Sequence, residues 1–151
     1  MNRSCYCLWD VQSTDRSAAM AELLCSDPGL GEHTRELLLR ALEAREHAGA
    51  TLVSPGISMP HCRSLLVEDF IVILGRSRKG VPWPDEPARL IVLFVSPVKP
   101  SGPQEHMELI KHLATKISES GQKLFKARSE EELAEMLGFR LAGSGTDEPG
   151  S

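Results

Sequence analysis

Two nearly continuous apolar runs near the middle of the chain predict buried strands. Residues 70–75 read Phe-Ile-Val-Ile-Leu-Gly, and residues 90–95 read Leu-Ile-Val-Leu-Phe-Val. Strands without polar alternation are typical of a sheet that is covered on both faces. The segment between them, residues 76–89, contains three prolines and a glycine and is expected to be a loop.

Apolar residues at helical spacing predict two long helices on either side of these strands. In residues 32–48, Leu38, Ala41, Leu42 and Arg45 fall on one face, and Gly49 is placed to end the helix. A second helix is expected after Ser101, which together with Gln104 matches the capping-box pattern. Its apolar face carries His106, Leu109, Ile110 and Leu113.

Shorter elements complete the pattern. We expect a first strand at residues 6–11, a helix after Asp15, two extended pieces around the bend at residues 54–56, and a last helix capped by Ser129. This order predicts an α/β (α+β) fold, a single domain of residues 1–141 with a mixed sheet flanked by helices on both faces. Residues 142–151 are rich in Gly, Ser and acidic residues and are expected to form a flexible tail.

Composition excludes several classes of partner. The chain has 151 residues and a formal net charge of -4, which argues against nucleic acid as a partner. The apolar runs are too short to cross a bilayer, so we expect no membrane insertion. Four cysteines are too few for a disulfide scaffold at this length, and a reduced, cytoplasmic protein is the simplest interpretation.

His61 is the first candidate for chemistry. It follows Pro60 at the end of a bent segment that also contains Gly56. Proline fixes the backbone and glycine permits a tight turn, so the imidazole is expected to have little freedom. A neutral imidazole is a nucleophile near pH 7 and is able to carry a phosphoryl group. The alternative is a histidine at a loop edge with one hydrogen bond.

Arg45 and His106 lie on helix faces that are otherwise apolar. A guanidinium there needs an anionic partner, and phosphate suits its planar fork. A structural ion pair, or an apolar stem with its head in water, would explain Arg45 equally well. His106, near a helix N-terminus, is placed to donate to a phosphoryl oxygen, or else is a core histidine with a satisfied hydrogen bond.

The cysteines permit a competing hypothesis. Cys5, Cys7 and Cys62 with His61 are residue types that bind zinc, but the Cys-x-Cys spacing is uncommon for zinc and no second pair exists. A reactive Cys62–His61 pair is also disfavoured, because adjacent residues on an extended segment point to opposite faces.

Taken together, these segments resemble a known family. Residues 50–63, Ala-Thr-Leu-Val-Ser-Pro-Gly-Ile-Ser-Met-Pro-His-Cys-Arg, resemble the active-site segment of enzyme IIA domains of the fructose–mannitol type in the bacterial phosphotransferase system. Arg45-Glu46 resembles their Arg-Glu helix end, residues 105–114 resemble their helix with a second active-site histidine, and residues 129–137 resemble their closing helix. The likeness extends over residues 6–140, in the same order throughout.

The resemblance implies a phosphotransferase in which His61 accepts a phosphoryl group and Arg45 and His106 steady it. It implies the histidine phosphocarrier protein as donor, a cysteine of an enzyme IIB domain as acceptor in sugar uptake, and no metal or cofactor. A cleft with a flat apolar rim is expected, since two proteins must bring their sites together. Trp83 and its prolines are a candidate part of that rim, or else form a plain surface loop.

Two rival functions stay open at this point. In the nitrogen-regulatory branch of the family, the phosphorylation state signals to a partner such as a kinase or transporter. A binding domain that is never phosphorylated is the other. The chain also departs from the family pattern, with Cys62 where glycine is usual and Pro55 near the bend where Gly or Asn is preferred. Cys62 is expected to crowd the donor or alter the local geometry.

Overall fold

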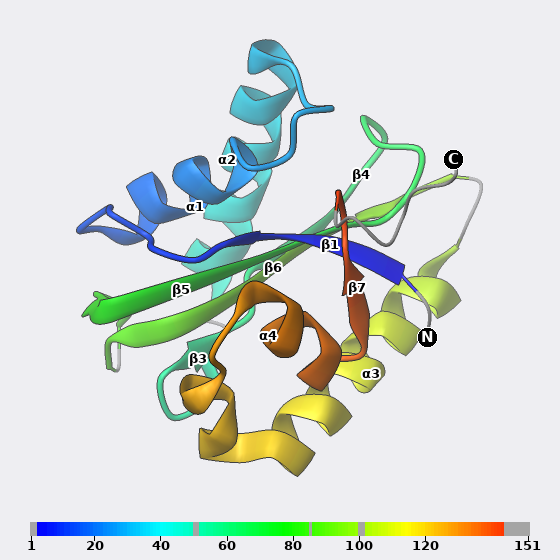
Figure 1. Cartoon of the computed structure of the whole chain (residues 1–151). Helices are drawn as coiled ribbons and strands as arrows, with labels where there is room; N and C mark the ends of the chain where they lie inside the picture. The colour runs from blue at the N-terminus through cyan, green and yellow to red at the C-terminus, as the bar shows by residue number, and fades with distance from the viewer. Residues whose placement is uncertain (1–2, 50–51, 85, 100–101, 144–151) are drawn as a thin grey trace.

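The computed structural model describes residues 3–49, 52–84, 86–99 and 102–143. Within these ranges a seven-stranded sheet lies between two layers of helices (Figure 1). The elements in chain order are β1 Arg3–Leu8, α1 Arg16–Leu24, α2 Glu32–Ala48, β2 Leu52–Ser54, β3 Ile57–Ser58, β4 His61–Ser64, β5 Ile71–Val81, β6 Ala88–Pro97, α3 Pro103–Ser120, the 3-10 helix η1 Gly121–Lys126, α4 Glu130–Met136 and β7 Phe139–Leu141.

The sheet is mixed, as predicted. Its strand order is β2-β3-β6-β5-β1-β7, and β4 also pairs with β6. The antiparallel β5–β6 hairpin forms the centre, with β1 parallel to β5 and β7 parallel to β1. On the other side of the hairpin, β3 and β4 both run parallel to β6. The short edge strands β3 and β4 therefore follow one another along a single long strand.

Each face of the sheet has its own apolar core, which confirms the predicted helical layers on both sides. On one face, alternate β6 residues such as Leu90 and Phe94 pack with α3, η1 and α4. On the other, the intervening residues such as Ile91 and Val95 pack with α1 and α2. A strand that contributes to two cores has no polar alternation, which explains its continuous apolar run.

The helix boundaries follow local signals. Asp15 accepts a hydrogen bond from the backbone N–H of Ala18, and Ser129 accepts one from that of Glu132, so both cap their helices as predicted. Gly121 ends α3 with φ 54°, a backbone conformation that favours glycine. The N-cap position of α3 is Gly102, not Ser101, and Ser101 lies outside the described residues.

Three sequence predictions differ from the structure. The loop expected at residues 76–89 is shorter than predicted, because β5 continues to Val81 through an irregular register and β6 begins at Ala88. The first strand spans Arg3–Leu8 and not residues 6–11, since its place is set by pairing with β5 and β7, which are distant in sequence. Ala142, expected in the tail, still donates to the Cys5 carbonyl, and residues 144–151 lie outside the described part.

One further property concerns membranes. Of the helices in the described ranges, none has the length and apolar character that spanning a bilayer requires.

Candidate functional site

The break between β3 and β4 orients the His61 imidazole. Proline cannot donate to a ladder, and Pro60 separates the two short strands. The Met59 carbonyl accepts a hydrogen bond of 2.7 Å from Nδ1 of His61. Because a carbonyl can only accept, Nδ1 carries the proton, and the lone pair of the neutral ring lies on Nε2. The local backbone therefore selects which nitrogen of His61 is nucleophilic.

Two further rings pack against His61. Phe94, its register partner on β6, stacks on the imidazole with ring centroids 4.9 Å apart and planes 8° apart. His106, in the first turns of α3, lies with its ring centroid 5.7 Å from that of His61. The structure thus brings together the two histidines that the sequence analysis selected, although 45 positions separate them.

A buried serine orients His106. Ser96 on β6 is fully buried, and its hydroxyl lies 2.7 Å from Nδ1 of His106. If the hydroxyl donates to Nδ1, the neutral ring of His106 keeps its proton on Nε2 and is itself a donor there. Sequence reasoning missed Ser96, because a serine at the end of an apolar run gives no signal of its own.

The surroundings keep both imidazoles neutral. Burial lowers the pKa of His61 below its ordinary value, and the charge of Arg45 acts in the same direction, against the Met59 carbonyl and Glu46. Burial also lowers the pKa of His106, with His61 and Arg63 acting in the same direction. Neutral rings at neutral pH are what a nucleophile at His61 requires.

The prediction that Arg45 faces the core is wrong. Arg45 is exposed, and its guanidinium donates to the Gly49 carbonyl at 2.9 Å. The buried stripe of α2 consists of Leu38, Leu42 and Glu46, which are spaced by four residues. Residues spaced by four form a ridge that is inclined to the helix axis. In the last turn the buried position is therefore Glu46 and not Arg45. Arg45 lies at the rim of the site, near enough to lower the pKa of His61.

Glu46 and Trp83 form a buried polar pair that was not foreseen. The indole Nε1 of Trp83 donates to a carboxylate oxygen of Glu46 at 3.1 Å, and Arg16 lies 3.6 Å from the same oxygen. Trp83 is only 5% exposed, so the suggestion that it forms an exposed apolar rim is wrong. Because the carboxylate of Glu46 accepts this hydrogen bond, the indole N–H of Trp83 is buried with a partner.

Arg63 is a cationic residue of the site that sequence reasoning also missed. It lies two residues after His61 on β4, on the same side of the strand, and its register partner on β6 is Ser96. Its Nε atom is buried and has no hydrogen-bond partner within the part of the chain that the structure describes. A buried guanidinium N–H without an acceptor is costly, and the charge of Arg63 acts on His106, whose pKa it lowers.

Cys62 lies on the opposite side of β4 from His61. Its side chain packs with the core under α1 and α2, and burial raises its pKa to about 12. The expected crowding of a donor by Cys62 does not fit this placement. Across the described ranges, no three His, Cys, Asp or Glu side chains are grouped as a metal site would need.

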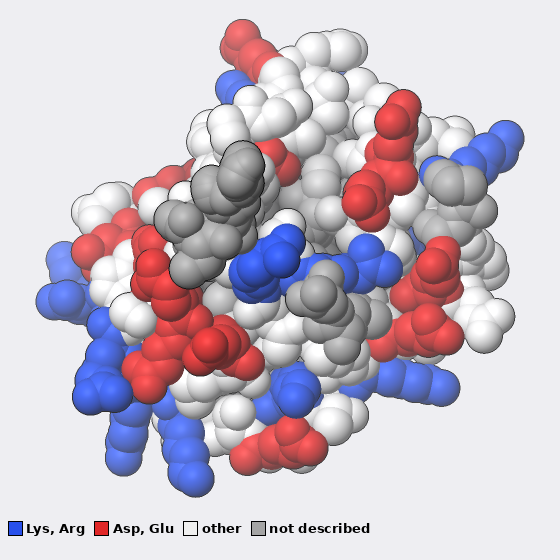
Figure 2. Space-filling model, turned by 45° about the vertical axis from the view of Figure 1, so that its right-hand side comes forward, with Lys and Arg blue, Asp and Glu red and all other residues white. Residues whose placement is uncertain are grey.

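Three exposed apolar side chains follow the two histidines closely in the sequence. Leu65 and Leu66, directly after β4, are 72% and 49% exposed, and Met107, next to His106, is 48% exposed. Figure 2 shows basic side chains gathered across the middle of one face, with acidic side chains at its flanks. An exposed apolar surface beside a reactive group is typical of a site that docks another protein.

Comparisons with known proteins give one family match and a similar protein of known name. Residues 18–138 match the family described as "Phosphoenolpyruvate-dependent sugar phosphotransferase system, EIIA 2". A "PTS system fructose-specific EIIABC component" from Bacillus subtilis (strain 168) is 23% identical over 134 residues, which are 85% of this chain and 21% of that protein. The chain therefore spans about a fifth of the length of that relative.

Solved structures share the fold. The nitrogen regulatory protein IIA-Ntr from Neisseria meningitidis superposes with a TM-score of 0.75 at 24% identity, over 87% of this chain and 92% of that one. Enzyme IIAMTL from Escherichia coli, solved in complex with phosphorylated enzyme IIBMTL, gives a TM-score of 0.62 at 15% identity, over 91% and 98%. At these identities the likeness shows the fold alone.

Proposed function

Because the chain belongs to the type 2 enzyme IIA family of the phosphoenolpyruvate-dependent sugar phosphotransferase system, we propose that it is a phosphocarrier that holds its phosphoryl group on Nε2 of His61. The observation that supports this most directly is the hydrogen bond from Nδ1 of His61 to the Met59 carbonyl. It leaves one nitrogen of a partly exposed, neutral imidazole with a free lone pair. That nitrogen is the atom able to attack phosphorus.

The proposed reaction moves the phosphoryl group between two imidazoles. Nε2 of His61 attacks the phosphorus of the phosphohistidine on the histidine phosphocarrier protein. An N–P bond forms to His61, which keeps its Nδ1 proton. The donor's N–P bond breaks, and the electron pair of that bond returns to the donor ring, which leaves as a neutral imidazole with the proton on its other nitrogen. In such chemistry the protein mainly positions the groups and offsets charge on the phosphoryl oxygens.

We assign the task of offsetting that charge to three residues. His106 offers an N–H when Ser96 donates to its other nitrogen. Arg63 has a buried N–H that lacks an acceptor among the described residues. Arg45 is held at the rim by the Gly49 carbonyl and would join them by rotating its side chain toward His61. Guanidinium groups suit this task because their planar fork binds two oxygens at once.

We propose an enzyme IIB domain as the acceptor in sugar uptake. The thiolate of its cysteine would attack phosphorus, forming an S–P bond while the His61 N–P bond breaks. The complex of a structurally similar IIA with a phosphorylated IIB supports this partner class. Leu65, Leu66 and Met107 would provide the apolar rim against which either partner docks.

A regulatory role is the second candidate. It takes its motivation from the printed name of one structurally similar protein, the nitrogen regulatory protein IIA-Ntr. In that case the phosphorylated and unphosphorylated forms would differ in affinity for a kinase or transporter, without transfer to enzyme IIB. Passage of label from His61 to a cognate enzyme IIB favours transport, and stable label with a phosphorylation-dependent partner favours regulation.

The central experiment is phosphorylation in a defined system. The protein is incubated with phosphoenolpyruvate, enzyme I and the cognate carrier and is then weighed by intact mass spectrometry. We expect a gain of one phosphate that is lost in acid, because a phosphorylated imidazole is a labile phosphoramidate. The gain should vanish in His61→Ala and persist in His33→Ala, a matched control because His33 is exposed on α2.

Two outcomes would contradict the proposal. Label that survives in His61→Ala would place the acceptor elsewhere. Failure of the wild-type protein to gain mass from a cognate donor would leave only a binding domain.

A further inference from the structure

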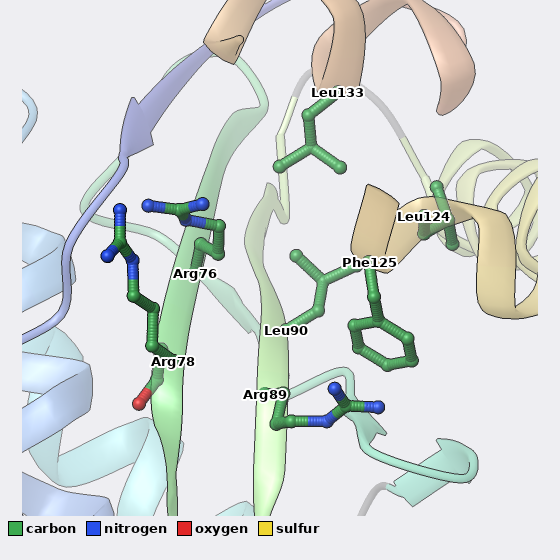
Figure 3. Close-up of a pocket in the computed structure, with 8 residues that line it drawn as sticks. Arg76, Arg78, Arg89, Leu90, Leu124, Phe125 and Leu133 are labelled. Carbon is green, nitrogen blue, oxygen red and sulfur yellow. The ribbon is translucent and has the colours of Figure 1, made fainter. Parts of the chain in front are cut away.

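A second polar site lies away from His61, between the sheet and the segment formed by η1 and α4. Figure 3 shows it, with Arg76 and Arg78 on β5, Arg89 and Leu90 on β6, and Phe125 on η1. Ser77, Leu124 and Leu133 complete the lining, and the cavity has a volume of about 210 Å³. We call it the arginine pocket.

The arginine pocket has an excess of positive charge. Asp10 is the carboxylate that Arg76 and Arg78 share, with its Oδ1 3.3 Å from the first guanidinium and 3.7 Å from the second. For Arg89, no ion pair is found with any carboxylate of the described residues. The lining carries three guanidinium groups and no carboxylate, and Asp10 pairs with two of the three. Such an excess favours an anionic ligand.

Aromatic rings hold two of these guanidinium groups in place. Arg76 donates to the Trp9 carbonyl at 2.8 Å and stacks on the Trp9 ring at 3.8 Å. Arg89 lies over the Phe125 ring at 4.0 Å. A ring covers the flat face of a guanidinium and leaves its N–H edge free. Because these two guanidinium groups are already held in place, less conformational entropy is lost when they bind a ligand.

The inner wall of the arginine pocket is apolar. Leu90, Leu124 and Leu133 are 2%, 3% and 1% exposed, so they belong to the core under α3 and α4. Phe125, which is only partly buried, is the apolar side chain of the lining that still presents surface to the carbon skeleton of a ligand. A bare inorganic anion would leave that surface unused.

We propose that the arginine pocket binds a small phosphorylated organic anion. A phosphate monoester carries about -1.5 to -2 charges at neutral pH, which matches the pocket better than a single carboxylate does. Its oxygens suit the planar fork of a guanidinium group such as that of Arg89. The cavity is smaller than the roughly 300–1,000 Å³ typical of sites for drug-sized ligands. A sugar phosphate or a compound of similar size is therefore the class that fits.

The arginine pocket is independent of the proposed phosphoryl-transfer site. Leu90 and Phe94 are four residues apart on β6, so about 13 Å of strand separates the pocket from His61. The two sites lie on the same face of the sheet. The backbone N–H groups of Arg89 and Leu90 donate to the Gly56 carbonyl in the turn that leads toward His61.

The test is a binding titration of the whole chain with fructose 6-phosphate, with fructose and inorganic phosphate as comparison ligands. Calorimetry gives the affinity, and backbone amide shifts locate the ligand. We expect fructose 6-phosphate to bind more tightly than inorganic phosphate, fructose not to bind, and shifts to centre on residues 89–90 and 124–125. Arg89→Gln and Arg78→Gln should each weaken binding by at least about tenfold, the loss of a charge-assisted contact.

The control variant is Arg40→Gln, which removes an exposed arginine of α2 on the other face of the sheet. Its affinity should equal that of the wild type, and circular dichroism should show that all variants are folded. Equal affinity for inorganic phosphate, unchanged affinity in both Arg89→Gln and Arg78→Gln, or shifts centred on His61 and Arg63 would each overturn the proposal. These results do not depend on whether His61 is phosphorylated.

Discussion

Two neighbouring residues of β4, His61 and Cys62, lie in opposite surroundings. His61 faces the side of the sheet that carries α3, where it contacts Phe94 and His106 and keeps one nitrogen free. Cys62 faces the side that carries α1 and α2, where it packs into an apolar core. One face of the strand is arranged for polar chemistry and the other for stability.

The difference shows how one short strand serves two purposes. Alternation of side chains places residues 61 and 63 on the site face and residue 62 on the core face. A nucleophilic thiol next to the imidazole would compete for a phosphoryl group. Burial raises the pKa of Cys62 to about 12, so its thiolate is scarce at neutral pH. The four predictions that follow test this contrast between the two faces.

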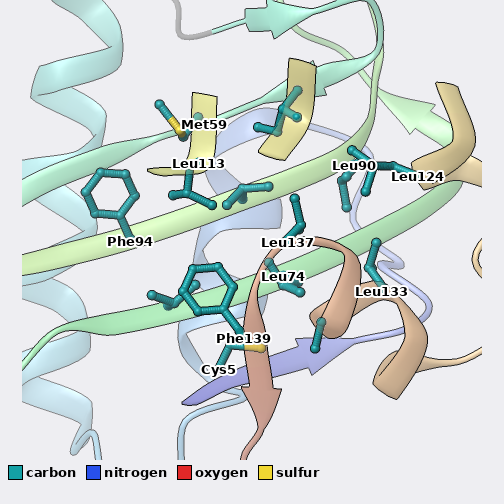
Figure 4. Close-up of a cluster of buried hydrophobic side chains, with 14 of the residues drawn as sticks. Cys5, Met59, Leu74, Leu90, Phe94, Leu113, Leu124, Leu133, Leu137 and Phe139 are labelled. Carbon is teal, nitrogen blue, oxygen red and sulfur yellow. The ribbon is translucent and has the colours of Figure 1, made fainter. Parts of the chain in front are cut away.

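The largest effect is expected from the ring beneath His61. Phe94 is fully buried and lies within the core of the site face (Figure 4). Phe94→Ala should lower the free energy of unfolding by about 3–5 kcal/mol, since it removes a large buried side chain. Urea denaturation measures this. Leu93→Ala, on the other face, is the matched comparison with about 2–5 kcal/mol. A Phe94→Ala loss below about 1 kcal/mol would mean that the ring is not part of the core.

The next effect concerns charge on the site face. Arg63→Gln should slow phosphorylation of His61 by roughly ten- to hundredfold, because it removes a charge-assisted contact of about 1.5–3 kcal/mol to the transferred group. Rapid-quench labelling from the phosphorylated carrier measures the rate. The exposed Arg40 of α2 provides the control, and Arg40→Gln should transfer at the wild-type rate. Equal rates for the two variants would remove Arg63 from the proposed site.

A smaller effect is expected on the core face. Cys62→Ala deletes one partly buried sulfur and should cost on the order of 1 kcal/mol of stability. Its labelling rate should stay within about twofold of the wild type, because Cys62 does not face His61. Urea denaturation and the same quench assay separate these two consequences. A large loss of rate with full stability would show that the two faces are not independent.

The smallest effect is expected from acid. Burial lowers the pKa of both His61 and His106 in the folded chain, whereas unfolded histidine titrates near ~6.5. Just below that pH the unfolded chain therefore binds more protons, and stability falls as the pH falls through this window. Urea midpoints at a series of pH values measure the slope. The slope should be shallower in the double variant His61→Gln, His106→Gln. An unchanged slope would assign the acid sensitivity to other groups.

Several features were predictable from the sequence because they depend on local chemistry. The apolar runs gave β5 and β6, and Asp15, Ser129 and Gly121 marked helix ends through hydrogen bonds or backbone freedom within a few residues. The segment before His61 predicted a bend at Gly56, which has φ 78°. These signals need no information about distant parts of the chain.

Sequence reasoning was weaker where a residue's role depends on partners far along the chain. Helical spacing predicted Arg45 on the core face, because spacing alone does not show where the core ends. The buried residue is Glu46, whose carboxylate accepts a hydrogen bond from Trp83, 37 positions away. Arg63 gave no local signal, since its place beside Ser96 comes from the parallel pairing of β4 with β6.

The sequence alone therefore determined the fold class, the layers and the choice of His61 and His106 as a candidate pair. Only the tertiary structure decided which nitrogen of His61 is free, that Arg45 is exposed, and that Cys62 faces away. The physical reason is the range of the interactions. Periodicity and caps act over one or two turns, whereas proton position, burial and charge are set by groups that the folded sheet brings together.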